Sequence, residues 1–168
     1  MHSGGTMRNL DEFDSYIPSK WPVLSTKQPW AQLILEKVKD IEIRSWTTTY
    51  RGPIWIHTGL KVDEYATSRF KRTGLFLGGL VGFAYLSGII PFSASSWEDW
   101  RERHLDNGDF DEKLAKYGWI LKNATPLPRP IKAKGEIGLY LLNEDTVKKV
   151  EQFCDIFQGF GECKEKMT

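Results

Sequence analysis

The feature that most constrains the fold is a change in the spacing of apolar residues near residue 40. Before it, apolar side chains recur three and four residues apart, at Trp30, Leu33, Ile34 and Val38. This spacing places them along one face of a helix. We therefore predict a helix over residues 28–39, with Pro29 in its first turn, where a missing N–H costs nothing.

After residue 40 the spacing of apolar residues falls to two, which is the period of a strand with one buried face. Ile41 and Ile43 then point to one side, and the opposite side carries Glu42, Arg44 and Trp46. We predict strands over residues 40–46 and 54–58, joined by a polar turn over 47–52. A charged row, with Lys39 beside it, thus faces away from the core.

Two segments resemble the ASCH domain (activating signal cointegrator homology), a branch of the PUA-like β-barrels. The first reads LSTKQPWAQLI followed by KDIEIRSWTTTYRGPIWIH, and the second combines YGW at residues 117–119 with PLPRPIKAKGEIGLY at 126–140. Lys39, Glu42 and Arg44 match the family motif. Two residues before Lys39 that motif has a glycine, whereas this chain has Lys37.

The resemblance covers residues 23–142 and implies an α+β fold, a PUA-like β-barrel of mixed, mostly antiparallel strands flanked by helices. We expect residues 1–22 to form an N-terminal tail and a short helix over 8–20. Residues 143–168 are expected to form a C-terminal helix packed on the domain, because apolar residues between 147 and 157 have helical spacing. At 168 residues the chain is long enough for one such domain with extensions.

Residues 75–92 contain no charge, which is close to the minimum length of a membrane-spanning helix. Four glycines and Pro91 interrupt this run, so we predict a buried strand over residues 80–90 and no membrane association. Cys154 and Cys163 lack C-x-x-C spacing, and no signal peptide follows the first residues. A reducing compartment, the cytoplasm, is therefore expected, and we expect a monomer.

The remaining elements follow from local patterns. We predict helices over residues 61–73 and 93–105, the second with Ser96 as its cap. Strands are predicted over residues 117–123 and 134–142, separated by a turn at the prolines of PLPRP. The acidic segment 106–112 is predicted to be a surface loop.

The net charge is only +1, but the charges are unevenly distributed. Residues 20–61 carry seven Lys and Arg against three Asp and Glu, and residues 117–138 carry four against one. Neighbouring barrel strands would join these segments into one positive face. The alternative is an ordinary surface of mixed charge.

These segments contain the residue types that bind a nucleotide or a nucleic-acid strand: cations for phosphate, aromatic rings for bases, and fixed polar groups for base edges. The candidates for binding RNA, single-stranded nucleic acid or a nucleotide are Gln28, Trp30, Lys39, Glu42, Arg44, Trp46, Tyr50, Arg51, Lys132 and Lys134. The alternative is purely structural: an ion pair between Glu42 and Arg44, with Trp46 packed against a neighbour.

An enzymatic alternative also stays open. ASCH-like proteins include an amidohydrolase that acts on a modified nucleoside and a protein similar to a metal-dependent ribonuclease. In such an enzyme Lys39 and Glu42 would be the catalytic residues. The amidohydrolase motif K-x-x-T has a threonine at the position of Glu42, so the same reaction is not expected. The histidines His2, His57 and His104 are scattered, so the sequence predicts neither a metal site nor a cofactor.

Overall fold

The computed structural model describes residues 17–156, and the two ends of the chain, 1–16 and 157–168, lie outside the description. The described residues contain six strands, β1 (Val23–Gln28), β2 (Ile41–Arg44), β3 (Gly52–Val62), β4 (Gly79–Pro91), β5 (Tyr117–Lys132) and β6 (Leu139–Tyr140). They also contain a 3₁₀ turn η1 (Pro18–Lys20) and five helices, α2 (Trp30–Leu35), α3 (Glu64–Phe70), α4 (Ala94–Asp99), α5 (Arg101–His104) and α6 (Glu144–Ile156).

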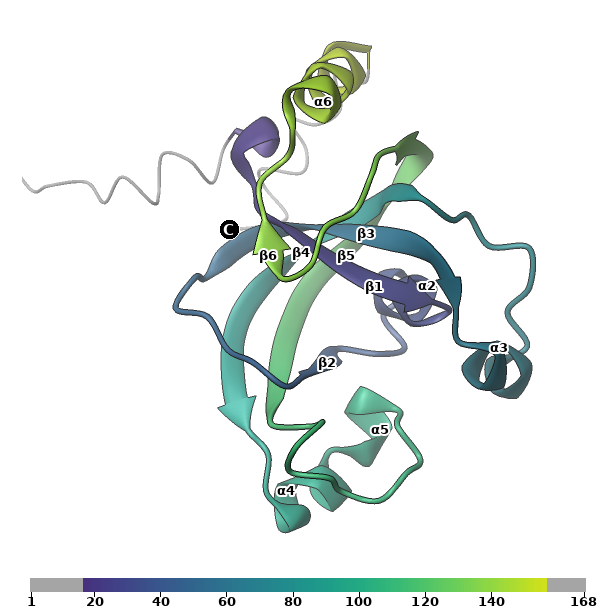
Figure 1. Cartoon of the computed structure of the whole chain (residues 1–168), viewed down its shortest axis with the longest axis vertical. Coiled ribbons are helices and arrows are strands. Elements are labelled where there is room, and N and C mark those ends of the chain that lie inside the picture. Colours follow the sequence, from purple (N-terminus) through teal and green to yellow (C-terminus); the bar gives the residue numbers. More distant parts are fainter. Residues whose placement is uncertain (1–16, 157–168) are drawn as a thin grey trace, which may run out of the picture.

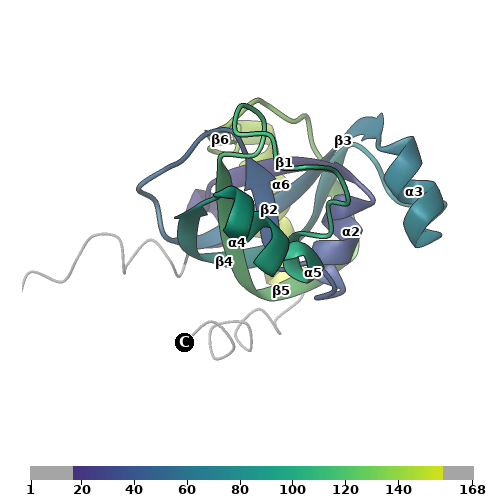
Figure 2. The ribbon, with the colours of Figure 1, turned by 90° about the horizontal axis from the view of Figure 1, so that it is seen from below.

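The six strands form one mixed sheet in the order β2-β5-β4-β3-β1-β6 (Figure 1). All neighbouring strands are antiparallel except β1 and β3, which run parallel with Ser25 opposite His57. The sheet curls into a half-barrel, with α2 to one side and α4 and α5 near β2 (Figure 2). This arrangement confirms the predicted PUA-like α+β architecture.

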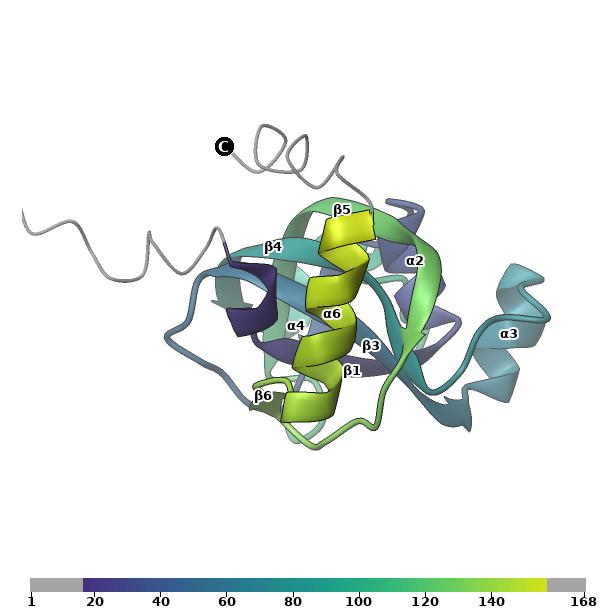
Figure 3. The ribbon, with the colours of Figure 1, turned by 90° about the horizontal axis from the view of Figure 1, so that it is seen from above.

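Three clusters of buried residues hold the fold together. One fills the curl of the sheet under α2, and another packs Phe92 and Trp97 against Ile41 near α4. The third joins α6 to the sheet, because Val150 and Phe153 pack among Trp21, Trp55 and other buried side chains. Helix α6 lies across this face of the sheet (Figure 3), so the expected C-terminal helix is part of the domain core.

The helix predicted over residues 28–39 is confirmed but shorter. Gln28 belongs to β1, and α2 ends at Leu35 because Lys37 adopts a left-handed φ of 61°. The amides of Val38 and Lys39 both donate to the carbonyl of Leu33, which closes the helix end in the manner usually provided by glycine. Val38 was predicted to lie on the apolar face of this helix, and that prediction was wrong, since its side chain is 48% exposed.

The predicted turn at PLPRP was also wrong, because β5 runs through it without a break. Pro128 and Pro130 lie between the pairs Pro126–Gly82 and Ile131–Leu80, where β5 bulges away from the regular ladder with β4. Strand β2 pairs with β5 only over residues 117–120, so at the prolines no strand among residues 17–156 pairs with this second edge of β5. The strand predicted over 134–142 is reduced to the two residues of β6.

Other boundaries differ for reasons of local hydrogen bonding. The cap of α4 is Ser93 rather than Ser96, which occupies the third helical position and completes a capping box with Ser93. The helix predicted over 61–73 begins only after Asp63, whose carboxylate accepts from the amide of Ala66. The buried strand predicted over 80–90 is confirmed as β4.

Most of the short helix predicted over 8–20, like Cys163, lies outside the described residues. No helix within residues 17–156 has the length and apolar character needed to cross a membrane.

Candidate functional site

Lys39 lies in a buried ion cluster at the start of β2. Its side chain is 3% exposed, and its Nζ donates to the carbonyls of Ile41 and His104, both at 2.7 Å. The same nitrogen lies 3.4 Å from a carboxylate oxygen of Glu42 and 5.1 Å from the centre of the Trp30 ring. Burial lowers the pKa of Lys39, and the charge of Glu42 opposes that shift. Two carbonyls and one carboxylate therefore use all three N–H donors of the ammonium group.

Glu42 and Arg44 link the two edges of the curled sheet. The hydroxyl of Thr26 on β1 donates to Glu42 at 3.1 Å, and Arg44 donates to the carbonyl of Ser25 at 2.6 Å. The pairing of β1 with β6 ends at Leu24, and Ser25 is the next residue along β1. Glu42 and Arg44 also pair with each other at 3.3 Å, as the structural alternative predicted. The charged row thus bridges the gap between β1 and β2.

The aromatic candidates pack against protein neighbours. Trp46 meets Trp119 edge to face, with 4.7 Å between ring centres, which agrees with the structural alternative. Trp30 packs on Phe70 and donates its indole N–H to Asp63 at 3.0 Å.

Polar candidates in the same unit are also hydrogen-bonded. Gln28 is 1% exposed, donates to the carbonyl of Phe76 and accepts from the amide of Gln32. The hydroxyl of Tyr50 donates to Pro53, and the exposed Arg51 donates to the carbonyls of Thr48 and Tyr50.

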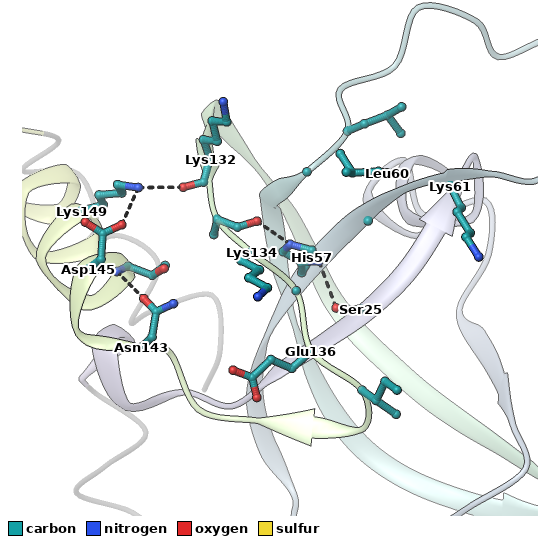
Figure 4. A pocket seen from close by; sticks show the side chains of 17 residues that line it. Ser25, His57, Leu60, Lys61, Lys132, Lys134, Glu136, Asn143, Asp145 and Lys149 are labelled. Carbon is teal, nitrogen blue, oxygen red and sulfur yellow. Dashed lines mark hydrogen bonds and ion pairs between the residues drawn. The ribbon is translucent and has the colours of Figure 1, made fainter.

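The other two candidates, Lys132 and Lys134, line a pocket of about 870 Å³ between the barrel and α6 (Figure 4). This size falls within the usual range for small-molecule sites. Four lysines line it, Lys61, Lys132, Lys134 and Lys149, against two carboxylates, Glu136 and Asp145. Lys149 pairs with Asp145 at 2.7 Å and also donates to the carbonyl of Lys132. Within residues 17–156, Lys61, Lys132 and Lys134 have no carboxylate within ion-pair distance. The pocket therefore presents free positive charge.

One wall of this pocket is a chain of hydrogen bonds that the sequence candidates did not include. The Oγ of Ser25 lies 2.9 Å from Nδ1 of His57 and 3.1 Å from the hydroxyl of Tyr140. The other ring nitrogen of His57 lies 2.9 Å from the carbonyl of Ala133. Burial lowers the pKa of His57, while burial raises the pKa of Tyr140 against its hydrogen bonds with Ser25 and the backbone of Glu136. All three side chains are therefore neutral near neutral pH.

The segment between β5 and β6 packs against this chain of hydrogen bonds at Gly135. A methyl group added at Gly135 would clash with the ring of His57 and lie 3.1 Å from the Oγ of Ser25. The alternation of β1 and β3 could have placed Ser25 beside His57 only if their parallel pairing had been known. Lys61 and Lys149 carried no sequence signal beyond their charge.

A second cavity, of about 540 Å³, lies on the other side of β6. Its lining includes Tyr50 and Arg51, together with Lys20, Thr48 and Tyr140. Strand β6 and the residues before it thus separate two groups of basic side chains. Within residues 17–156 no cluster of three or more His, Cys, Asp or Glu side chains could hold a metal ion.

The curled mixed sheet and its flanking helices define the protein as a PUA-like α+β domain. The description of the family model that matches residues 24–161 is "ASCH domain", and the chain belongs to this family. The match includes α6 as well as the barrel.

Solved structures and curated proteins agree with this assignment. The crystal structure of ASCH from Zymomonas mobilis superimposes with a TM-score of 0.58 at 18% identity, covering 80% of this chain and 95% of that one. Activating signal cointegrator 1 of Mus musculus and of Homo sapiens are each 38% identical over 69 residues, which is 40% of this chain. The alignment spans only 12% of the length of those two proteins.

Proposed function

We propose that the protein binds single-stranded nucleic acid, with the strand's phosphates on the lysines of the large pocket. The observation that carries this proposal is the set of three lysines, Lys61, Lys132 and Lys134, that line one pocket without a carboxylate partner among the described residues. An ammonium group that has no internal partner is available to a phosphate, and each such contact releases a counterion. Membership of the ASCH family is consistent with RNA binding.

The path of the strand follows from the two cavities. From the large pocket it crosses the residues around β6 and reaches Tyr50 and Arg51 in the smaller cavity. The ring of Tyr50 can stack on a base, and the exposed guanidinium of Arg51 can contact a phosphate. In this proposal Lys39, Glu42 and Arg44 support the interface from inside rather than contact the ligand, because Lys39 donates to two carbonyls, Arg44 donates to the carbonyl of Ser25, and Glu42 pairs with both.

The same contacts favour binding over hydrolysis. A catalytic base needs a free lone pair within reach of a substrate. Lys39 is buried and donates to two carbonyls. We therefore assign Lys39 and Glu42 no catalytic role.

Filter binding of a short single-stranded RNA at several salt concentrations tests the proposal. Affinity should fall as salt rises, and Lys132→Ala and Lys134→Ala should each reduce the salt slope by about 0.7. Lys113→Ala is the matched control, because it removes an exposed lysine that directly follows the acidic segment and lies outside both cavities. If the control lowers the slope as much as the pocket variants do, or if binding does not depend on salt, the proposed interface is wrong.

A further inference from the structure

The hydrogen-bond chain in the pocket wall has a fixed direction, which follows from the acceptor at its end. The carbonyl of Ala133 can only accept, so the Nε2 of His57 that lies 2.9 Å away must carry the proton. In a neutral imidazole the other nitrogen, Nδ1, is then an acceptor. The hydroxyl of Ser25, 2.9 Å from Nδ1, consequently donates its only proton to His57.

The remaining contact of Ser25 is determined in the same way. Because the serine proton is used, the hydroxyl of Tyr140, 3.1 Å away, donates to the Oγ of Ser25. A serine oxygen has two lone pairs, and this bond uses one of them. Ser25, which is half-buried and lines the pocket, therefore offers one free lone pair and no proton. A ligand group that meets Ser25 must be a hydrogen-bond donor.

The cationic part of the pocket lies close to this acceptor. Gly135 packs directly against Ser25 and His57. Lys134 is the residue before Gly135, so the Cα atoms of Lys134 and Gly135 are about 3.8 Å apart. Figure 4 shows Lys134 next to the His57–Ser25 pair, with Lys132 and Lys149 toward α6 and Lys61 on the opposite side. One ligand can thus place an anion at a lysine and a donor at Ser25.

From these positions we infer that the pocket recognises the ribose of a nucleic-acid strand, with the sugar's 2′-hydroxyl donating to the Oγ of Ser25 while neighbouring phosphates bind the lysines. The 2′-hydroxyl is the group by which a protein distinguishes RNA from DNA at a single site. Bases also carry donors, but those differ from base to base, whereas every ribonucleotide has this hydroxyl beside its phosphate. The inference rests on the proposed function and specifies its ligand as RNA.

Alternative chemistry at Ser25 is less well supported by the same contacts. A serine beside a histidine base is one arrangement for a nucleophile. Here Tyr140 donates to the serine oxygen, which draws electron density away from it, and a backbone carbonyl rather than a carboxylate orients His57. Accepting a hydrogen bond from a ligand requires no stronger base than His57 and no movement of Ser25, His57 or Tyr140.

The test compares the wild-type protein on four fluorescently labelled oligouridylates of equal length that differ only at the 2′ position: hydroxyl, hydrogen, fluorine and O-methyl. The hydroxyl form should bind roughly two- to tenfold more tightly than the other three, which is the equilibrium factor of one net hydrogen bond. The fluorine form keeps an RNA-like sugar but has no donor. If it binds as tightly as the hydroxyl form, sugar shape and not donation to Ser25 determines the preference, and the inference fails.

Two variants locate the effect at Ser25. Ser25→Ala should bind all four probes with the affinity that the wild type shows for the 2′-hydrogen form, whereas Tyr140→Phe should keep the preference because Ser25 still donates to His57. A preference that survives Ser25→Ala would overturn the inference. Equal binding of all four probes, with a salt slope that still responds to Lys134→Ala, would refute ribose recognition and leave the proposed function standing. No binding of any probe would refute both.

Discussion

Replacing Lys39 by methionine tests whether this lysine supports the fold or contacts the ligand. Methionine keeps most of the side-chain volume and removes the charge and its three donors. Two carbonyls, of Ile41 and His104, then lose their donor inside the protein. Glu42, which is 7% exposed, loses one of its two cationic partners and keeps Arg44 at 3.3 Å.

The size of the effect follows from these losses. Breaking a buried ion pair by removing one partner costs about 3 to 5 kcal/mol, and the surviving contact with Arg44 places the expected loss near the lower limit, about 3 kcal/mol. Because a domain of this size is stable by only about 5 to 15 kcal/mol, the variant should show a clearly lower urea midpoint. The melting temperature should fall by roughly 6 to 12 °C.

Urea denaturation followed by tryptophan fluorescence measures this loss, and Lys134→Met is the matched control. The side chain of Lys134 is exposed, so the control should change the free energy of unfolding by less than about 0.5 kcal/mol. Folded Lys39→Met protein should keep the wild-type salt slope for RNA binding. An unchanged free energy of unfolding together with a lower salt slope would show that Lys39 contacts phosphate, and the reasoning from burial would be refuted.

Three further predictions concern single positions. Lys37→Gly should stabilise the protein by about 0.5 to 1 kcal/mol, measured by urea denaturation, because glycine adopts the left-handed φ of 61° without strain. Gly135→Ala should destabilise it by about 1 to 3 kcal/mol, because the new methyl group would clash with the ring of His57, whereas Gly59→Ala, with nothing near its Cβ, should change stability far less. Burial lowers the pKa of His57 and of His104 below the ordinary value of 6.5, so the unfolded chain binds more protons just below that pH. Stability should therefore be lost as the pH falls from 6.5 through the lowered pKa values, and His57→Gln should reduce this slope in a series of thermal melts.

The resemblance to the ASCH domain predicted the class of fold, and the spacing of apolar residues predicted several of its elements. The uncharged run interrupted by glycines became the buried strand β4, and the helical spacing near the C-terminus became α6, so both of these predictions were confirmed. Boundaries failed where a single backbone conformation or hydrogen bond determines them. The left-handed conformation of Lys37 ended α2 early, and a lysine gives no sign of that conformation in a sequence.

The prolines of β5 show a different limit of sequence interpretation. Proline clusters usually mark turns, and only the sheet order reveals that, in the described part of the chain, no strand pairs with one edge of β5 at these prolines. The candidate site was limited in a similar way. Lys132 and Lys134 were predicted, but Ser25 and His57 become neighbours only through the parallel pairing of β1 with β3, a long-range contact that local patterns do not encode.

The three prolines of β5 also affect how the protein behaves at high concentration. A strand edge that offers both donors and acceptors can bind the edge of another copy, and repeated addition of this kind leads to fibres. Pro126, Pro128 and Pro130 have no N–H group and lie where β5 bulges, so this stretch offers no regular row of donors. The stretch of β5 that leads to Lys132, beside the large pocket, can therefore remain uncovered for a ligand without recruiting a second chain.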